Sequence, residues 1–164
     1  MRVPASVPST PSPELLARVH GILAQVADPE IPVLSVLDLG VIRHVLLRDD
    51  GKLEVGIAPT YSGCPATAVI KTDVLRALAG AGFDALAVDV LSPPWSSEWL
   101  SAEGRRKLEA FGIAPPHAGA HRPAACPRCG SQQTTRISEF GSTPCKALYR
   151  CESCLEPFDY FKCI

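Results

Sequence analysis

Residues 41–60 read VIRHVLLRDDGKLEVGIAPT, and this stretch decides the fold class of the N-terminal part of the chain. Two runs rich in β-branched and aliphatic residues, VIRHVLLRD and KLEVGIAPT, flank the turn sequence DDGK. An Asp-Gly pair between two such runs is a strong hairpin signal, because glycine accepts the positive backbone φ that tight hairpin turns need. We therefore expect two neighbouring antiparallel strands here.

Amphipathic helices are predicted on both sides of this hairpin. In SPELLARVHGILAQVADPE (12–30) apolar residues recur at helical spacing, and the helix is expected to stop at Asp28, which precedes a proline. GCPATAVIKTDVLRALAGAG (63–82) predicts a second helix that begins at Pro65 and ends at glycines. DALAVDVL (84–91) predicts a third strand, which the second helix reaches as a crossover. The fold class is therefore α/β, a small α-β-β-α-β sandwich.

The rest of the chain is predicted to hold one more helix, a linker and a small module. SSEWLSAEGRRKLEAFGI (96–113) is amphipathic and is expected to cover one edge of the sheet. APPHAGAHRPAA (114–125) lacks periodicity and is typical of a linker. The expected division is a disordered leader over 1–12, an α/β domain over 13–112, a linker over 113–125 and a zinc-ribbon module over 126–164.

Composition limits the classes of function. The chain has 164 residues, a formal net charge of -1 and a sequence pI of about 6.4, so no basic field indicates binding to nucleic acid or to an anionic membrane. No apolar run reaches the length of a membrane span. The start, MRVPASVPSTPSPE, lacks the apolar core of a secretory signal, so a cytoplasmic protein is expected. In a reducing compartment its seven cysteines suit metal binding or thiol chemistry better than disulfides.

Four cysteines near the C-terminus form two CxxC pairs, Cys126 with Cys129 and Cys151 with Cys154, separated by 21 residues. Two thiolates on one tight turn can take adjacent corners of a tetrahedron, and two such turns close a metal site. A module of this size buries too little surface to fold unaided, so the metal is expected to fold it. Zinc is favoured, although the spacing alone does not separate it from an iron-sulfur cluster. Small core cysteines and a redox CxxC are the weaker alternatives.

Two further cysteines, Cys145 and Cys163, accompany this site. Short strands are predicted in QQTTRISEF, CKALYR and EPFDYFKC. If Arg150 lies opposite Pro157, then Cys145 faces Lys162 and adjoins Cys163, on the order of 16 Å from the metal at the rise of a strand. Two interpretations stay open: a cross-strand pair of small residues, or a second thiolate site that holds or passes a metal or cluster.

The seventh cysteine, Cys64, directly precedes Pro65 at the start of the second helix. Free N–H groups and the helix dipole would favour its thiolate there, and the loop TYSG could expose it, although a lone cysteine is usually a buried filler. Asp28, Glu30 and Asp38 lie within eleven residues of one another. Turn and capping roles are favoured for them, and the alternative is an acidic rim near Cys64 that binds a metal or a partner.

The motifs resemble two known families. DPEIPVLSVLDLGVI (28–42) followed by PTYSGCPA (59–66) resembles the small domain of iron-sulfur cluster assembly factors of the SufT-like and eukaryotic cytosolic-assembly type. Together with CPRCGSQQTT (126–135), EFGSTPCKALYRC (139–151) and CLEPFDYFKC (154–163), the whole chain resembles the D subunits of bacterial phenylacetyl-CoA epoxidase systems.

The resemblance implies an iron-sulfur-assembly-like domain over 13–112 and a role in aerobic phenylacetate catabolism. Other subunits of that system carry the di-iron oxygenase and the flavin and iron-sulfur reductase, and the D protein is implied to help mature a metal centre in one of them. Cys64 matches the functional thiol of the assembly factors. Asp28, Glu30 and Asp38 match an acidic motif without assigned chemistry. The family often ends in Cys-His, whereas this chain ends in Cys163 and Ile164.

The expected function is therefore that of an accessory or maturation protein of the epoxidase, with structural zinc and a transient iron or iron-sulfur cluster. Its expected partners are the oxygenase and reductase subunits, with no nucleic acid and no membrane. The alternatives are a non-catalytic structural subunit of the oxygenase complex and a zinc-ribbon nucleic-acid binder. A nucleic-acid binder is the weaker alternative, because the tail has five Lys or Arg against four Asp or Glu, and phosphate contacts need many cations. Three questions stay open: whether the chain has an activity of its own, which subunit is its client, and whether it forms a homodimer.

Overall fold

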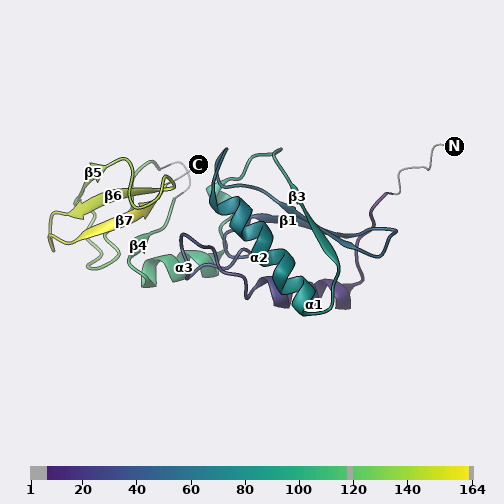
Figure 1. Ribbon diagram of the computed structural model, residues 1–164. Helices are drawn as coiled ribbons and strands as arrows, with labels where there is room; N and C mark the ends of the chain where they lie inside the picture. The colour runs from purple at the N-terminus through teal and green to yellow at the C-terminus, as the bar shows by residue number, and fades with distance from the viewer. Residues whose placement is uncertain (1–6, 118–119, 163–164) are drawn as a thin grey trace. The chain divides into compact units, whose positions relative to one another are not determined.

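The computed structural model describes residues 7–117 and 120–162 of the chain, which divides into two compact units, Met1–Pro94 and Trp95–Ile164. The first unit contains α1 (Pro13–Leu23), β1 (Ile42–Leu47), β2 (Leu53–Ile57), α2 (Ala66–Gly80) and β3 (Ala85–Asp89) (Figure 1). The second contains η1 (Ser97–Trp99), α3 (Ala102–Ala110), β4 (Ile113–Ala114), β5 (Thr134–Ser138), β6 (Lys146–Cys151) and β7 (Pro157–Phe161) (Figure 1). Within residues 7–117 and 120–162, no helix is long and apolar enough to cross a membrane.

The first unit is built on a three-stranded sheet in the order β1-β2-β3. The predicted hairpin is confirmed: β1 and β2 are antiparallel, and the turn between them places Gly51 at φ 80°. The predicted crossover is also present, because β2 and β3 are parallel and α2 connects them. Helix α2 contacts β3 and α1 contacts α2 (Figure 1).

The core of the first unit lies on one face of this sheet. Alternate side chains of β2, Val45 of β1 and one stripe of each helix are buried, as the pleat of a strand and the turn of a helix require. These side chains are Val19, Leu23, Val45, Leu53, Val55, Ile57, Ile70, Val74 and Leu78. Full burial of such side chains stabilises a fold by roughly 1.5 to 3 kcal/mol each, so the first unit has an ordinary apolar core.

Two expectations for the N-terminal segment need correction. Helix α1 ends at Leu23 rather than at Asp28, because the chain turns back and the N–H of Val36 donates to the carbonyl of Val26 at 2.9 Å. The described part of the predicted disordered leader is ordered: Ser9 and Leu47 exchange backbone hydrogen bonds of 2.9 and 2.7 Å. Residues 1–6 of that leader lie outside the described residues.

The second unit contains a four-stranded sheet in the order β4-β7-β6-β5. The three predicted C-terminal strands are present as the antiparallel strands β5, β6 and β7. The predicted register is confirmed, because Arg150 lies opposite Pro157. Strand β4 was not predicted; it pairs in parallel with β7 at the start of the segment expected to be a linker.

The structure also places α3 differently from the expectation. The helix was expected to cover the first sheet, but it belongs to the second unit and contacts β4. The ring of Trp95 meets that of Phe161 edge-on at 5.9 Å, and the guanidinium of Arg105 donates to the carbonyls of Pro116 and Ser97. The compact units therefore divide at Pro94, not at residue 112, and the segment 113–125 is partly packed against the ribbon.

Candidate functional site

The structure brings together the four cysteines of the two CxxC pairs. The Sγ atoms of Cys126, Cys129, Cys151 and Cys154 all lie within 4.8 Å of one another, with Cys126 to Cys154 at 3.9 Å and Cys129 to Cys151 at 3.5 Å. A tetrahedral zinc ion with Zn–S bonds of about 2.3 Å requires sulfurs about 3.8 Å apart. The four thiols therefore fit a closed tetrahedral metal site.

Each CxxC pair lies on a tight turn, here called a knuckle: the first knuckle is residues 126–131 and the second is residues 151–156. The N–H of Gly130 donates to the carbonyl of Cys126 at 2.9 Å, and the N–H of Leu155 donates to that of Cys151 at 3.0 Å. The two knuckles thus have matching backbone hydrogen bonds. This repeated conformation aims two sulfurs from each knuckle at one point.

Backbone N–H groups donate to a sulfur of each knuckle: that of Arg128 donates to the Sγ atom of Cys126 at 3.4 Å, and Cys151 receives two such hydrogen bonds. The Sγ atom of Cys151 accepts from the N–H groups of Cys154 at 3.5 Å and Ser153 at 3.4 Å. The Cys154 N–H, aided by the Ser153 N–H and the neighbouring thiols, lowers the pKa of Cys151 from 9.0 to about 6, against the opposing effect of burial. These hydrogen bonds favour the thiolate form of Cys151.

The neighbouring thiol of Cys154 shifts in the opposite direction. The Glu156 N–H lowers its pKa, but burial and the sulfurs of Cys151, Cys129 and Cys126 together raise it to about 12. Thiolates crowded into one site repel one another, so some keep their protons until a cation arrives. A divalent metal ion removes this repulsion and allows all four sulfurs to ionise.

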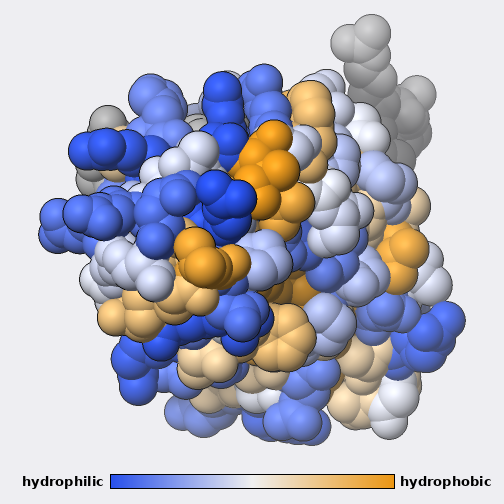
Figure 2. All heavy atoms as spheres, turned by 90° about the vertical axis from the view of Figure 1, so that its left-hand side faces the viewer, coloured by the Kyte–Doolittle hydropathy of each residue, from blue (hydrophilic) through white to orange (hydrophobic). Residues whose placement is uncertain are grey.

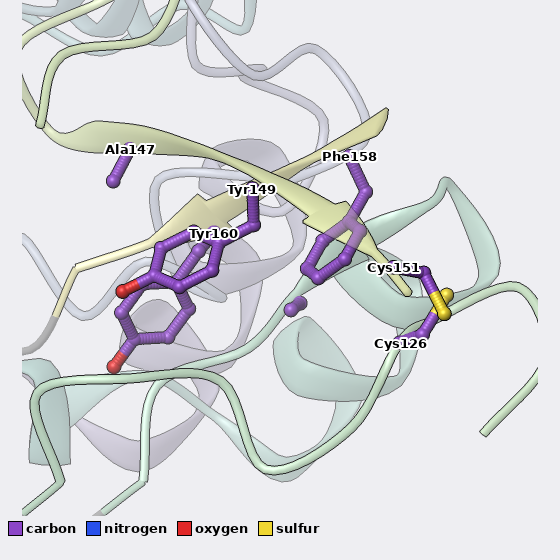
Figure 3. Close-up of a cluster of buried hydrophobic side chains, with 7 residues drawn as sticks. Cys126, Ala147, Tyr149, Cys151, Phe158 and Tyr160 are labelled. Carbon is purple, nitrogen blue, oxygen red and sulfur yellow. The ribbon is translucent and has the colours of Figure 1, made fainter. Parts of the chain in front are cut away.

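The four-cysteine group lies at one end of the ribbon's apolar core (Figure 3). The rings of Tyr149 and Phe158 stack at 6.0 Å, and those of Tyr149 and Tyr160 meet edge-on at 5.7 Å. Figure 3 shows the sulfurs of Cys126 and Cys151 side by side, beyond the ring of Phe158. Packing of this core and closure of the metal site therefore depend on the same two knuckles.

Cys145 lies outside the four-cysteine group. Its backbone carbonyl accepts from the N–H of Lys162 at 3.0 Å, which confirms that these two residues face each other. Its buried thiol lies 3.0 Å from the hydroxyl of Thr143, a contact that the spacing of cysteines does not reveal. Cys163 lies outside the described residues, so the pair that it was expected to form with Cys145 stays a prediction.

Cys64 lies, as expected, directly before the start of α2, whose capping residue is Pro65. Its Sγ atom accepts from the hydroxyl of Thr60 at 3.8 Å, and its carbonyl accepts from the N–H of Thr67 at 3.2 Å. The expectation that the loop exposes this thiol is wrong, because only 9% of Cys64 is accessible. Gly63, directly before it, has a positive φ of 77°.

The acidic residues of the N-terminal loop hold turns. One carboxylate oxygen of Asp28 accepts from the N–H groups of Glu30 at 2.8 Å and Ile31 at 2.7 Å. Asp38 accepts from the N–H of Ser35 at 3.0 Å, while the Ser35 hydroxyl accepts from the N–H of Asp38 at 3.0 Å. Both aspartates are buried. These contacts are the turn roles that the sequence favours, and the acidic rim stays a prediction.

Over residues 7–117 and 120–162, the four-cysteine group is the one set of three or more Cys, His, Asp or Glu whose ligand atoms can reach a common metal ion. Neither Cys64 nor the acidic residues Asp28, Glu30 and Asp38 belong to it. A metal bound by Cys64 would therefore need its other ligands from outside the four-cysteine group.

Comparison with known proteins first defines the class. Residues 16–90 match the family described as iron-sulfur cluster assembly protein, and residues 114–162 match the PaaD zinc beta ribbon domain. A crystal structure of a DUF59 domain from Bacillus anthracis superposes with a TM-score of 0.52 at 25% identity, covering 56% of this chain and 89% of that chain. The chain thus joins an iron-sulfur cluster assembly domain to a zinc ribbon.

Two curated relatives narrow this class. The Escherichia coli K12 protein named as the D subunit of a "Putative 1,2-phenylacetyl-CoA epoxidase" is 46% identical over 95% of this chain and 98% of its own length. The Bacillus subtilis Fe-S protein maturation auxiliary factor YitW is 33% identical over 53% of this chain and 86% of its own length. The chain belongs to the family of 1,2-phenylacetyl-CoA epoxidase D subunits.

Proposed function

We propose that the chain is an accessory protein of a 1,2-phenylacetyl-CoA epoxidase system that assists assembly of an iron or iron-sulfur centre in an oxygenase or reductase subunit. The observation that carries this proposal is the joining of an iron-sulfur cluster assembly domain to a PaaD zinc ribbon in one chain. Its similarity to the D subunit of an epoxidase extends over nearly the whole of both proteins. The proposed site of action is the cytoplasm, because a reducing compartment suits cysteines that act as metal ligands or thiols, and the six described cysteines form no disulfide.

The proposal assigns structural zinc to Cys126, Cys129, Cys151 and Cys154. Four thiolates at tetrahedral spacing satisfy a zinc ion completely and leave no open coordination position. Such a site stabilises a fold but does not readily release or accept a second metal. The iron or cluster that the chain handles is therefore cargo held elsewhere.

Cys64 is the proposed cargo ligand. It precedes α2, where the N–H groups of the first helical turn have no partner within the helix and attract an anionic sulfur. The Thr60 hydroxyl, 3.8 Å from this sulfur, adds a donor. A single thiolate supplies one ligand, so the client protein would supply the others. Because Cys64 is buried, its surroundings have to open when cargo is bound.

The test is to produce the oxygenase and reductase subunits alone, with this chain, and with the Cys64→Ser variant, and to measure iron in the purified subunits. We expect the wild-type chain to raise the iron content of one subunit and Cys64→Ser to leave it near the level seen without the chain. Cys145→Ser tests the other buried thiol outside the four-cysteine group: an iron content near that of wild type assigns the cargo to Cys64, and a loss equal to that of Cys64→Ser would place Cys145 in the cargo site as well. Equal iron content in all samples would refute the proposal.

One observation favours a second candidate, a docking subunit that transfers no metal. The thiol of Cys64 is buried and hydrogen-bonded in this structure, as expected of a residue that only packs. A docking subunit stays with the mature oxygenase in stoichiometric amount, whereas an assembly factor leaves it. Purification of the iron-loaded oxygenase separates the two candidates by the amount of this chain that accompanies it.

A further inference from the structure

The two knuckles share a backbone conformation and differ in one side chain. The residue after the second cysteine has a positive φ in both, 77° at Gly130 and 66° at Leu155. In both, its N–H donates to the carbonyl of the first cysteine. The first knuckle thus has the residue type that suits this conformation, and the second has a leucine.

Leucine at this position costs stability. In the left-handed region the Cβ atom of an L residue crowds the adjacent carbonyl oxygen, whereas glycine has no Cβ. Among the described residues, Leu155 is the one residue other than glycine with a positive φ. Leu155 is also 67% exposed, so burial of its side chain offsets little of the free-energy cost of this conformation. Stability of the chain alone therefore favours glycine at position 155.

A conformational cost of this kind points to a use for the side chain outside the fold. Figure 2 shows one face of the molecule, where hydrophobic surface forms separate small patches among hydrophilic side chains. Single exposed apolar residues of this kind are ordinary. Leu155 differs from the others because its exposure coincides with an unfavourable backbone conformation.

Charge around Leu155 selects the kind of partner. Glu152 and Glu156, both exposed, lie on the same knuckle, and Glu152 forms an ion pair with Arg150 at 3.3 Å. Two copies of the chain meeting through this knuckle would oppose like charges. A different protein with cationic side chains fits better.

We propose that Leu155 is an apolar anchor through which the second knuckle docks onto a protein partner that has an apolar socket with a basic rim. The inference rests on the proposed function, which makes that partner a subunit of the epoxidase system. A leucine that fills a socket loses its exposed apolar surface on binding, and such central anchors dominate many interfaces. The conformational cost is then retained because it benefits docking.

The test compares Leu155→Gly with wild type in the full chain. Leu155→Gly should keep the metal content, raise the melting temperature of the ribbon, and weaken binding to the purified oxygenase subunits at least tenfold, measured by calorimetry. Leu155→Met keeps an apolar side chain and should bind within threefold of wild type. The matched control is Leu91→Ala, because Leu91 is an equally exposed leucine of the first unit, at 70%, and it should change neither quantity.

The outcomes separate this inference from the proposed function. If wild type binds the oxygenase subunits and Leu155→Gly binds them with the same Kd, the anchor is wrong and the proposed function stands. A lower melting temperature for Leu155→Gly would overturn the claim that leucine costs stability here. If wild type binds no subunit of the epoxidase system, both the anchor and the proposed function fail.

Discussion

The two units of the chain are stabilised by different means. The first has an ordinary core of aliphatic side chains, with Leu23, Val55 and Leu78 fully buried. The ribbon of the second has a short core of aromatic rings that ends at four sulfurs. From this difference we expect the ribbon to need its metal ion in order to fold. The first unit, which contains Cys64, should fold without a metal ion. The following predictions test this separation, from the largest effect to the smallest.

Removal of the metal should have the largest effect, and only on the ribbon. Binding of structural zinc contributes on the order of 10 kcal/mol in zinc-finger peptides, which exceeds what the short aromatic core can supply. We expect a strong chelator to abolish the dispersed amide signals of residues 126–162 in an NMR spectrum, while those of residues 16–90 persist. A ribbon that stays folded without metal, or a first unit that unfolds with it, would break the comparison.

Leu78→Ala should destabilise the first unit and leave the ribbon unchanged. The side chain is fully buried in the first unit, and loss of such a leucine costs about 2 to 5 kcal/mol because a cavity remains. Urea unfolding of the first unit should show this loss, and the metal content of the ribbon should stay unchanged. The exposed Leu91 gives the control: Leu91→Ala should change the free energy of unfolding by less than about 0.5 kcal/mol.

Asp38→Ala distinguishes the turn role from an acidic rim. The buried carboxylate accepts the N–H of Ser35, and leaving that donor unsatisfied costs about 1 to 3 kcal/mol. Asp38→Asn keeps an acceptor oxygen and should lose less. Urea unfolding measures both variants. If Asp38→Ala instead keeps full stability and loses bound iron, the residue belongs to a metal-binding rim.

The pH dependence of metal binding should show the smallest effect. Metal uptake requires thiolates, so affinity falls as the pH falls. Above pH 6 Cys151 is already ionised, because its pKa is lowered to about 6, whereas Cys154, raised to about 12, must still release its proton. Below pH 6 Cys151 must lose a proton as well. The metal affinity should then fall by a further factor of about ten, or 1.4 kcal/mol, for each pH unit. Competition with a chelator at pH 5 to 8 measures this slope, and an unchanged slope would refute the assignment.

Local sequence signals predicted much of this fold and site. The Asp-Gly turn predicted the first hairpin, and the two CxxC pairs identified the four cysteines that meet. The register of β6 and β7 was also predictable, because the second knuckle forms the turn of that hairpin and leaves little freedom for the pairing of Arg150 with Pro157. These features depend on residues that are neighbours in sequence or are linked through one turn.

Features that depend on distant contacts were not predictable. Helix α1 stops early because Val26 pairs with Val36 across a loop. Helix α3 joins the second unit through its contact with β4. Helical periodicity shows which face of a helix is apolar but not what covers it. The burial of Cys64 and the positive φ of Leu155 likewise depend on the folded loops around them.

The central claim is that the ribbon holds structural zinc while the first unit handles iron through Cys64. Its most direct test is the zinc, iron and labile sulfide content of the chain purified anaerobically in complex with its client subunit, which supplies the other cargo ligands, compared between wild type and Cys64→Ser. We predict about one zinc per chain in both complexes, and iron that is present with wild type and lost with Cys64→Ser. Iron that stays unchanged in Cys64→Ser, or zinc that disappears with it, would contradict the claim.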